Sequence, residues 1–165
     1  MAKIQGYDLH AAKKMAEYFF EIGREAYLSV NAAAINHNQD YIYKSIVGNV
    51  NTVFACEIIL KILNYEEGID LKDLDNKHRL NELFQLLPEE KKNIIKNDTV
   101  DIINSIITNQ ESYSENNFCE DLGAIQNAYV ECRYWYEIPA AGEKGKNAKQ
   151  LFSYAFCKAM FKWIN

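Results

Sequence analysis

The sequence has few of the residues that interrupt regular structure. Only seven glycines and two prolines occur in 165 residues, and a sandwich or barrel of many short strands needs far more turns than these can supply. Apolar residues make up 48% of the chain and charged residues 25%, which is a globular composition and argues against disorder. We therefore expect one folded domain that spans residues 1–165.

The sequence also lacks the spacings typical of metal and hydrolase sites. There are three histidines, His10, His37 and His78, and they lie far apart. No HExxH, GxSxG or CxxC pattern occurs, so we expect no metal and no cofactor. Each cysteine has apolar neighbours, which favours buried free thiols in a reducing compartment. The four are Cys56, Cys119, Cys132 and Cys157.

No long uncharged apolar run is present. The most apolar stretch, residues 46–63, is interrupted by two asparagines, a glutamate and a lysine, so we do not expect it to span a membrane. The first six residues have no apolar core of the kind that a secretory signal carries. These observations predict a cytoplasmic protein.

Positive charge is scarce except at the end of the chain. Residues 1–138 carry 13 basic and 22 acidic side chains, a net charge of −9, whereas residues 139–165 carry five lysines and one glutamate, a net of +4. An acidic body argues against broad non-specific binding of nucleic acid, which depends on many lysine and arginine contacts to phosphate. A local basic patch is expected at a loop over residues 139–146 and just after it, at Lys144, Lys146 and Lys149.

Apolar residues recur in steps of three and four along nearly the whole chain, which predicts helices. Asp8 is a suitable N-cap for the first helix, Gly68 suits the end of the second, and Pro88 suits the start of another. We expect an all-α, up-and-down bundle of four to five main helices with short extra helices in the middle. The expected helices are 8–34, 39–65, 77–87, one that starts after Pro88, a short one capped by Asp98 or Thr99 and ending at 107, 118–138 and 147–164; loops are expected at 69–76 and 108–117.

The first expected helix carries a stripe of small residues. Ala12, Ala16, Gly23 and Ala26 follow helical spacing, so that a partner helix can approach closely. A chain with more apolar faces than one bundle covers tends to pair through the remainder. We therefore expect a homodimer that forms through the first helix or through the last one.

Two charges lie inside the otherwise apolar second helix. Glu57 and Lys61 are four residues apart with the acid first, which is the favourable order for a pair on one helix face. A buried charge without a partner costs several kcal/mol (about 3–5 when a pair is broken), and Arg133 on a later helix offers a donor fork suited to a carboxylate. Two interpretations remain: an internal ionic cluster that sets the register of the helices, or a ligand or catalytic pocket. His78 either holds a loop at a helix start or acts as a general acid or base.

Three segments together resemble the HEPN superfamily (higher eukaryotes and prokaryotes nucleotide-binding). They are ACEIILK at residues 55–61, HRLNELFQLLP at residues 78–88 and RYWYE at residues 133–137. Many members of this superfamily have an E-L-x-L-K-like segment, then H-x-L-x-x-L-F, then R-Y-x-Y-E. The resemblance spans roughly residues 40–138.

The resemblance implies a helical bundle, a homodimer and a place among RNA-binding or RNA-cleaving proteins of toxin–antitoxin, abortive-infection and related defence or stress systems. A nucleotidyltransferase-like partner protein is common in such systems. The active nucleases of the superfamily use an arginine followed about one to two helical turns later by a histidine. Here the arginines are Arg24, Arg79 and Arg133. None has a histidine at that distance, so the nuclease site does not carry over.

We therefore predict a HEPN-like module that binds RNA, a nucleotide or a partner protein and has no family-type nuclease activity and no catalytic residues. One alternative is a metal-independent ribonuclease that uses His78, Arg79 and Arg133. Another is a purely structural interaction module. The candidate binding or structural residues are Glu57, Lys61, His78, Arg133, Tyr134 and Glu137.

Overall fold

The computed structural model describes residues 8–35, 41–107, 112–126 and 149–164. In these ranges the chain is helical and contains no strand, which confirms the all-α fold. The helices are α1 (Leu9–Ile35), α2 (Tyr41–Glu66), α3 (Leu71–Asp75), α4 (Leu80–Gln85), α5 (Glu89–Ile106), α6 (Glu115–Ile125) and α9 (Gln150–Phe161).

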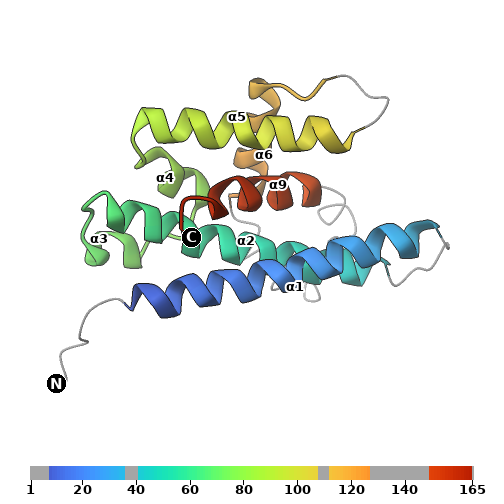
Figure 1. Ribbon diagram of the computed structural model, residues 1–165, viewed down its shortest axis with the longest axis horizontal. Coiled ribbons are helices and arrows are strands. Elements are labelled where there is room, and N and C mark those ends of the chain that lie inside the picture. Colours follow the sequence, from blue (N-terminus) through green and yellow to red (C-terminus); the bar gives the residue numbers. More distant parts are fainter. Residues whose placement is uncertain (1–7, 36–40, 108–111, 127–148, 165) are drawn as a thin grey trace.

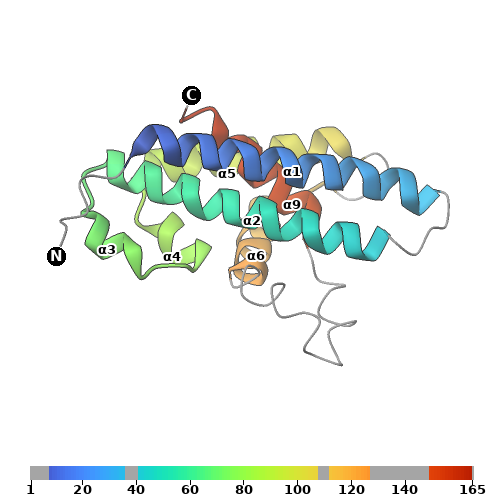
Figure 2. The ribbon, with the colours of Figure 1, turned by 90° about the horizontal axis from the view of Figure 1, so that it is seen from below.

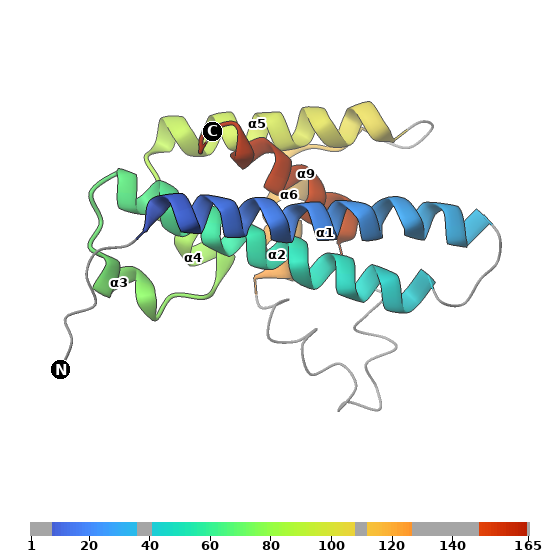
Figure 3. The same ribbon diagram turned by 60° about the horizontal axis from the view of Figure 1, so that its bottom comes forward.

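The longer helices run in alternating directions, as in an up-and-down bundle. In Figure 1, α1 and α5 run one way, whereas α2 and α9 run the other way. Figure 3 shows α9 between α5 and the pair formed by α1 and α2. In Figure 2, α3, α4 and α6 lie on the side of α2 that faces away from α1. Helix α2 is therefore covered from several sides, which explains why its sequence is apolar nearly all round.

The stripe of small residues on α1 is used inside the chain. Ala12, Ala16 and Gly23 are buried, and α1 packs along α2. A Cβ at Gly23 would lie 2.1 Å from Thr52 Oγ1 and 3.1 Å from the carbonyl oxygen of Gly48. The absence of a side chain at Gly23 thus permits the close approach that the stripe predicts, and the helix that approaches is α2 of the same chain.

Aromatic side chains hold the centre of the bundle. Phe84 of α4, Phe118 of α6 and Phe156 of α9 are buried, with ring centroids 5.5–5.7 Å apart. Phe152 stacks on Phe156 at 5.6 Å and meets Phe118 edge-on at 5.4 Å. Edge-to-face and offset pairs at these distances stabilise a core beyond the area that they bury. This cluster fixes the positions of α4 and α6 against α9.

Several helix ends follow the predicted signals. The Asp8 carboxylate accepts from the Ala11 amide at 3.0 Å, Gly68 has a positive φ of 89° just after α2, and Pro88 precedes α5. Helix α9 begins at Gln150, three residues later than predicted. Lys149 is described and is not helical, whereas residues 147 and 148 lie outside the described residues.

The boundaries in the middle of the chain differ from the prediction in four places. The helix expected over 77–87 covers only Leu80–Gln85, as α4. The expected loop at 69–76 contains α3, which the Asp70 carboxylate caps by accepting from the Lys72 amide at 2.9 Å. No break occurs at Asp98 or Thr99, because the Thr99 hydroxyl donates to the carbonyl of Ile95 one turn back, inside a continuous α5. Helix α6 begins at Glu115 rather than 118, because Ser114 and Asn117 form a capping box. The end predicted at 138 lies outside the described residues.

Within the described residues one stretch, Lys44–Glu66, is long and apolar enough to cross a membrane by length and composition. About two thirds of its most apolar window (67%) is buried inside the protein. The core helix of a soluble protein meets the same two criteria, and the burial of α2 under its neighbours fits that class.

Candidate functional site

Glu57 lies near the middle of the buried face of α2. Only 5% of its side chain is exposed, and its Oε1 atom lies 3.0 Å from Lys61 Nζ. The pair is the one that their four-residue spacing predicts. The side chain of Lys61 is itself mostly buried, so this ion pair is screened by solvent far less than a surface pair.

His78 completes this cluster from the segment before α4. Its Nδ1 atom lies 2.9 Å from Glu57 Oε1, while 58% of its side chain is exposed. When the Glu57 carboxylate is ionised, it can only accept this hydrogen bond, and Nδ1 is then the donor. The second ring nitrogen has no hydrogen-bond partner among the described residues. An imidazole oriented in this way can exchange a proton with a group in solution.

The cluster has one unsatisfied atom. Glu57 Oε2 is buried and accepts no hydrogen bond from the described part of the chain. Arg133, which we predicted as the partner of Glu57, lies outside the described residues, as do Tyr134 and Glu137. The pairing of Glu57 with Arg133 therefore stays a prediction.

Of the basic tail, the structure describes only Lys149. Its Nζ atom lies 2.8 Å from Asp121 Oδ1, on α6. Asp121 also accepts a 2.8 Å hydrogen bond from the Tyr113 hydroxyl. Burial, together with this hydrogen bond, raises the pKa of Tyr113 above its usual range. Lys149 is thus paired with a carboxylate of the body, whereas Lys144 and Lys146 lie outside the described residues.

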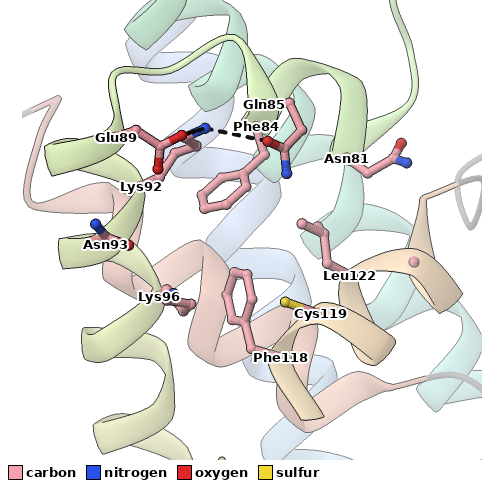
Figure 4. Close-up of a pocket in the computed structure, with 11 residues that line it drawn as sticks. Asn81, Phe84, Gln85, Glu89, Lys92, Asn93, Lys96, Phe118, Cys119 and Leu122 are labelled. Carbon is pink, nitrogen blue, oxygen red and sulfur yellow. Dashed lines mark hydrogen bonds and ion pairs between the residues drawn. The ribbon is translucent and has the colours of Figure 1, made fainter. Parts of the chain in front are cut away.

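A separate pocket opens between α4, α5 and α6. Its volume is about 320 Å³, at the lower end of the roughly 300–1,000 Å³ range of small-molecule sites. Figure 4 shows two phenylalanine rings at its floor, Phe84 and Phe118, with Leu122 beside them. Three amide side chains line its wall: Asn81, Gln85 and Asn93.

Two lysines of α5 supply positive charge to this pocket. Lys92 is buried, with 11% of its side chain exposed, and Lys96 follows it one helical turn later with 22% exposed. The Lys92 ammonium donates to Gln85 Oε1 at 3.3 Å and lies 2.5 Å from Glu89 Oε1. Burying a lysine ammonium is costly unless anions or hydrogen-bond acceptors surround it, and here Glu89 and Gln85 are those partners.

The amides complete the chemistry of the pocket. Within the described residues, the Asn93 side chain makes no hydrogen bond. The Gln85 amide accepts one through its oxygen and donates none. Amide groups donate and accept in one plane. An apolar floor, free amides and fixed cations together suit a small ligand that has a flat polar ring and an anionic group.

Sequence reasoning missed this pocket. Lys92 and Lys96 have the i, i+4 spacing of one helix face, but that spacing is equally typical of a solvated face. Residues of α4, α5 and α6 line the pocket together, and no periodicity predicts how these helices pack. One local signal could have indicated burial: Lys92 stands three residues before Ile95 and therefore shares a helix face with an apolar residue.

Cys119 also lines the pocket and is exposed, so our expectation of four buried thiols is wrong at this residue. It lies on α6, next to the buried Phe118. Cys56 and Cys157 are buried in the core as expected, and burial, together with the neighbouring Cys56, raises the pKa of the Cys157 thiol. Cys132 lies outside the described residues.

No protein-family model, curated protein or solved structure matches the chain. In the part that the structure describes, no group of three or more metal-ligating side chains comes together. The functional assignment therefore depends on the geometry of the polar cluster and the pocket, and on the three segments that resemble the HEPN superfamily.

Proposed function

We propose that this protein is a HEPN-like binding module whose pocket between α4, α5 and α6 takes a nucleotide. The observation that carries the proposal is the mostly buried Lys92 side chain, beside Lys96 and free amides, above a floor of two phenylalanines. A phosphate suits the lysines, the edge of a base suits the amides, and the flat ring suits the apolar floor. Of the three ligand classes that the sequence suggests, these contacts favour the nucleotide.

The test is calorimetric titration of the purified protein with nucleoside monophosphates. Lys92→Met and Lys96→Met keep the length of the stem and remove the charge. We expect each to weaken binding about tenfold or more, because a hydrogen bond to a charged group contributes roughly 1.5–3 kcal/mol. Lys72→Met is the matched control, since Lys72 is exposed on α3. Absence of binding at millimolar nucleotide, or equal losses in all three variants, would overturn the proposal.

The Glu57–His78 pair favours one second candidate, the ribonuclease. An imidazole held by a buried carboxylate is a plausible proton-transfer group, yet metal-free RNA cleavage also needs a cation at the phosphate. Lys61, the cation beside this pair, is mostly buried and held by Glu57, and the nearest arginine in the sequence, Arg79, pairs at 3.3 Å with Glu82. We therefore expect no RNA cleavage above background. Cleavage by the wild type that vanishes in His78→Ala, on a panel of structured and single-stranded RNAs, would establish the ribonuclease instead.

The third alternative is a purely structural module, in which the polar cluster only fixes the register of α2 against the start of α4. Glu57→Gln distinguishes it from a binding role. If the cluster is structural, this variant loses stability and leaves nucleotide and RNA binding unchanged. A change in ligand binding without a change in stability would argue for a binding role of the cluster.

We propose that the protein forms a homodimer through the outer side of α1. The small-residue stripe is occupied by α2, whereas Met15, Tyr18 and Ile22 are exposed at helical spacing on the other side. Light scattering at micromolar concentration should give twice the chain mass of 19.1 kDa. A monomer mass, or a dimer that persists in Tyr18→Lys, would contradict this interface.

The wider setting follows from the resemblance alone. A cytoplasmic protein of a bacterial toxin–antitoxin or defence system, with a nucleotidyltransferase-like partner, fits a HEPN-like module. Co-purification of such a partner from the native host would support this setting.

A further inference from the structure

Each pocket lysine already holds a carboxylate of the chain itself. Lys92 Nζ lies 2.5 Å from Glu89 Oε1, and Lys96 Nζ lies 2.6 Å from Glu115 Oε2. The first carboxylate comes from α5 and the second from the first turn of α6. Two negatively charged groups therefore mark two positions for anions at the edge of the pocket.

The partners in these two pairs are unequally exposed. The lysine side chains are 11% and 22% exposed, whereas the side chains of Glu89 and Glu115 are 80% and 61% exposed. The surrounding helices fix the cations, but the acids reach them from solvent. Solvent weakens an ion pair whose acidic partner is so exposed. An anion that arrives from solution can therefore replace the glutamates at little cost.

The two positions are one helical turn apart. Residues at i and i+4 have Cβ atoms about 5–6 Å apart on the same face of a helix. A single phosphate reaches one ammonium well, whereas two phosphoryl groups joined through a bridging oxygen can reach both. Phosphate oxygens also form shorter and stronger bonds to a lysine than neutral acceptors do.

We propose that the pocket has two anion subsites, at Lys92 and Lys96, and that its ligand carries two linked phosphoryl groups, which displace Glu89 and Glu115 from the lysines. This proposal rests on the proposed function and specifies its ligand class. A nucleoside diphosphate meets the requirement because its base reaches the amides and the phenylalanine floor. Free inorganic diphosphate shares the anionic chemistry but lacks the ring.

The first experiment ranks four ligands by calorimetry on the wild-type protein: ADP, AMP, adenosine and inorganic diphosphate. We expect ADP to bind about tenfold or more tightly than AMP, because the second phosphoryl group gains one charge-assisted contact. Adenosine should bind more weakly than AMP. Inorganic diphosphate that binds as tightly as ADP would overturn the assignment of a nucleoside diphosphate, because the ring would then add nothing to the affinity. Equal affinities for ADP and AMP would overturn the two-subsite proposal while the proposed function stands.

The second experiment tests the displacement of the glutamates. Glu89→Gln and Glu115→Gln remove the competing charges, and Glu90→Gln and Glu120→Gln are matched controls on the same two helices, at exposed positions. We expect each of the first two variants to bind ADP up to about fivefold more tightly, and the controls to bind it as the wild type does. Melting temperatures check that the helices stay folded.

The outcomes separate the two proposals. An equal gain in all four variants would show that only net charge matters, and no gain in any variant would show that the glutamates do not compete; either result overturns the displacement. Failure of the wild type to bind any of the nucleotides would overturn the proposed function itself.

Discussion

Gly23→Ala is expected to destabilise the protein, although alanine is the better helix former. The added Cβ would lie 2.1 Å from Thr52 Oγ1, much closer than non-bonded atoms approach. The Thr52 hydroxyl cannot simply turn away, because it donates at 2.9 Å to the carbonyl of Gly48 inside the buried contact. That carbonyl oxygen would itself be 3.1 Å from the new atom. Either α1 moves away from α2 or the hydrogen bond breaks.

Three contributions set the size of the effect. Alanine in place of a mid-helix glycine favours folding by about 1 kcal/mol. Inserting a methyl group into a packed contact costs roughly 1–3 kcal/mol, and loss of the buried hydrogen bond costs about 1 kcal/mol more. The gain in helix propensity offsets only the hydrogen bond. We expect Gly23→Ala to lower the free energy of unfolding by about 1–3 kcal/mol.

Urea denaturation followed by circular dichroism measures this change. Gly123→Ala is the control, because a Cβ at Gly123 on α6 meets nothing within 4 Å and should raise stability by up to about 1 kcal/mol. In the double variant Gly23→Ala/Thr52→Ala the hydroxyl is gone, so the loss should be smaller than the sum of the two single losses. A Gly23→Ala protein as stable as the wild type, or strictly additive losses, would refute this reasoning.

Three further predictions follow from buried polar groups. Asn64→Ala should lower the free energy of unfolding by about 1–3 kcal/mol in urea, because its buried amide donates at 2.9 Å to the carbonyl of Leu83 and so joins α2 to α4; an unchanged midpoint would contradict this link. The pKa of Tyr113 is raised from its usual 10, so the folded state keeps this proton when the unfolded state begins to lose it. Its contribution to stability is therefore complete below pH 10 and is lost as the pH rises above that value. Tyr113→Phe should lose less stability than the wild type between pH 9 and pH 11, and equal losses would refute the assignment. Glu57→Ala and Arg133→Ala should each destabilise the protein, by roughly 3–5 kcal/mol if the pair is buried, and the double variant by less than their sum; additive losses would show that the two residues do not meet.

The fold was largely predictable because its signals are local. Helical spacing gives α1 and α2 to within two residues at each end, and Asp8, Gly68 and Pro88 act at helix ends as their side chains or backbone preferences predict. Each of these features depends on neighbours within one or two turns. A single sequence contains that information.

The errors in the middle of the chain have a physical cause. A hydroxyl or carboxylate can cap a helix or bond within one, and the sequence does not choose between these roles. Thr99 bonds back to Ile95 inside α5, whereas Asp70 caps the five-residue α3. The choice depends on whether Leu74 of α3 can be buried in the core, which is a tertiary effect.

The candidate site was predictable only in part for the same reason. The four-residue spacing predicts the pairing of Glu57 with Lys61, but His78 contacts Glu57 across 21 positions of sequence. The pocket needs three helices at once, α4, α5 and α6. Lys92 is buried only once the helices have packed, which its local sequence does not reveal.

The most direct test of the account is a crystal structure of the protein grown with ADP. We expect density for the nucleotide between α4, α5 and α6, with one phosphate at Lys92 Nζ, the other at Lys96 Nζ, and the side chains of Glu89 and Glu115 turned into solvent. An empty pocket at saturating ADP, or a nucleotide bound elsewhere with both glutamates still on the lysines, would contradict it.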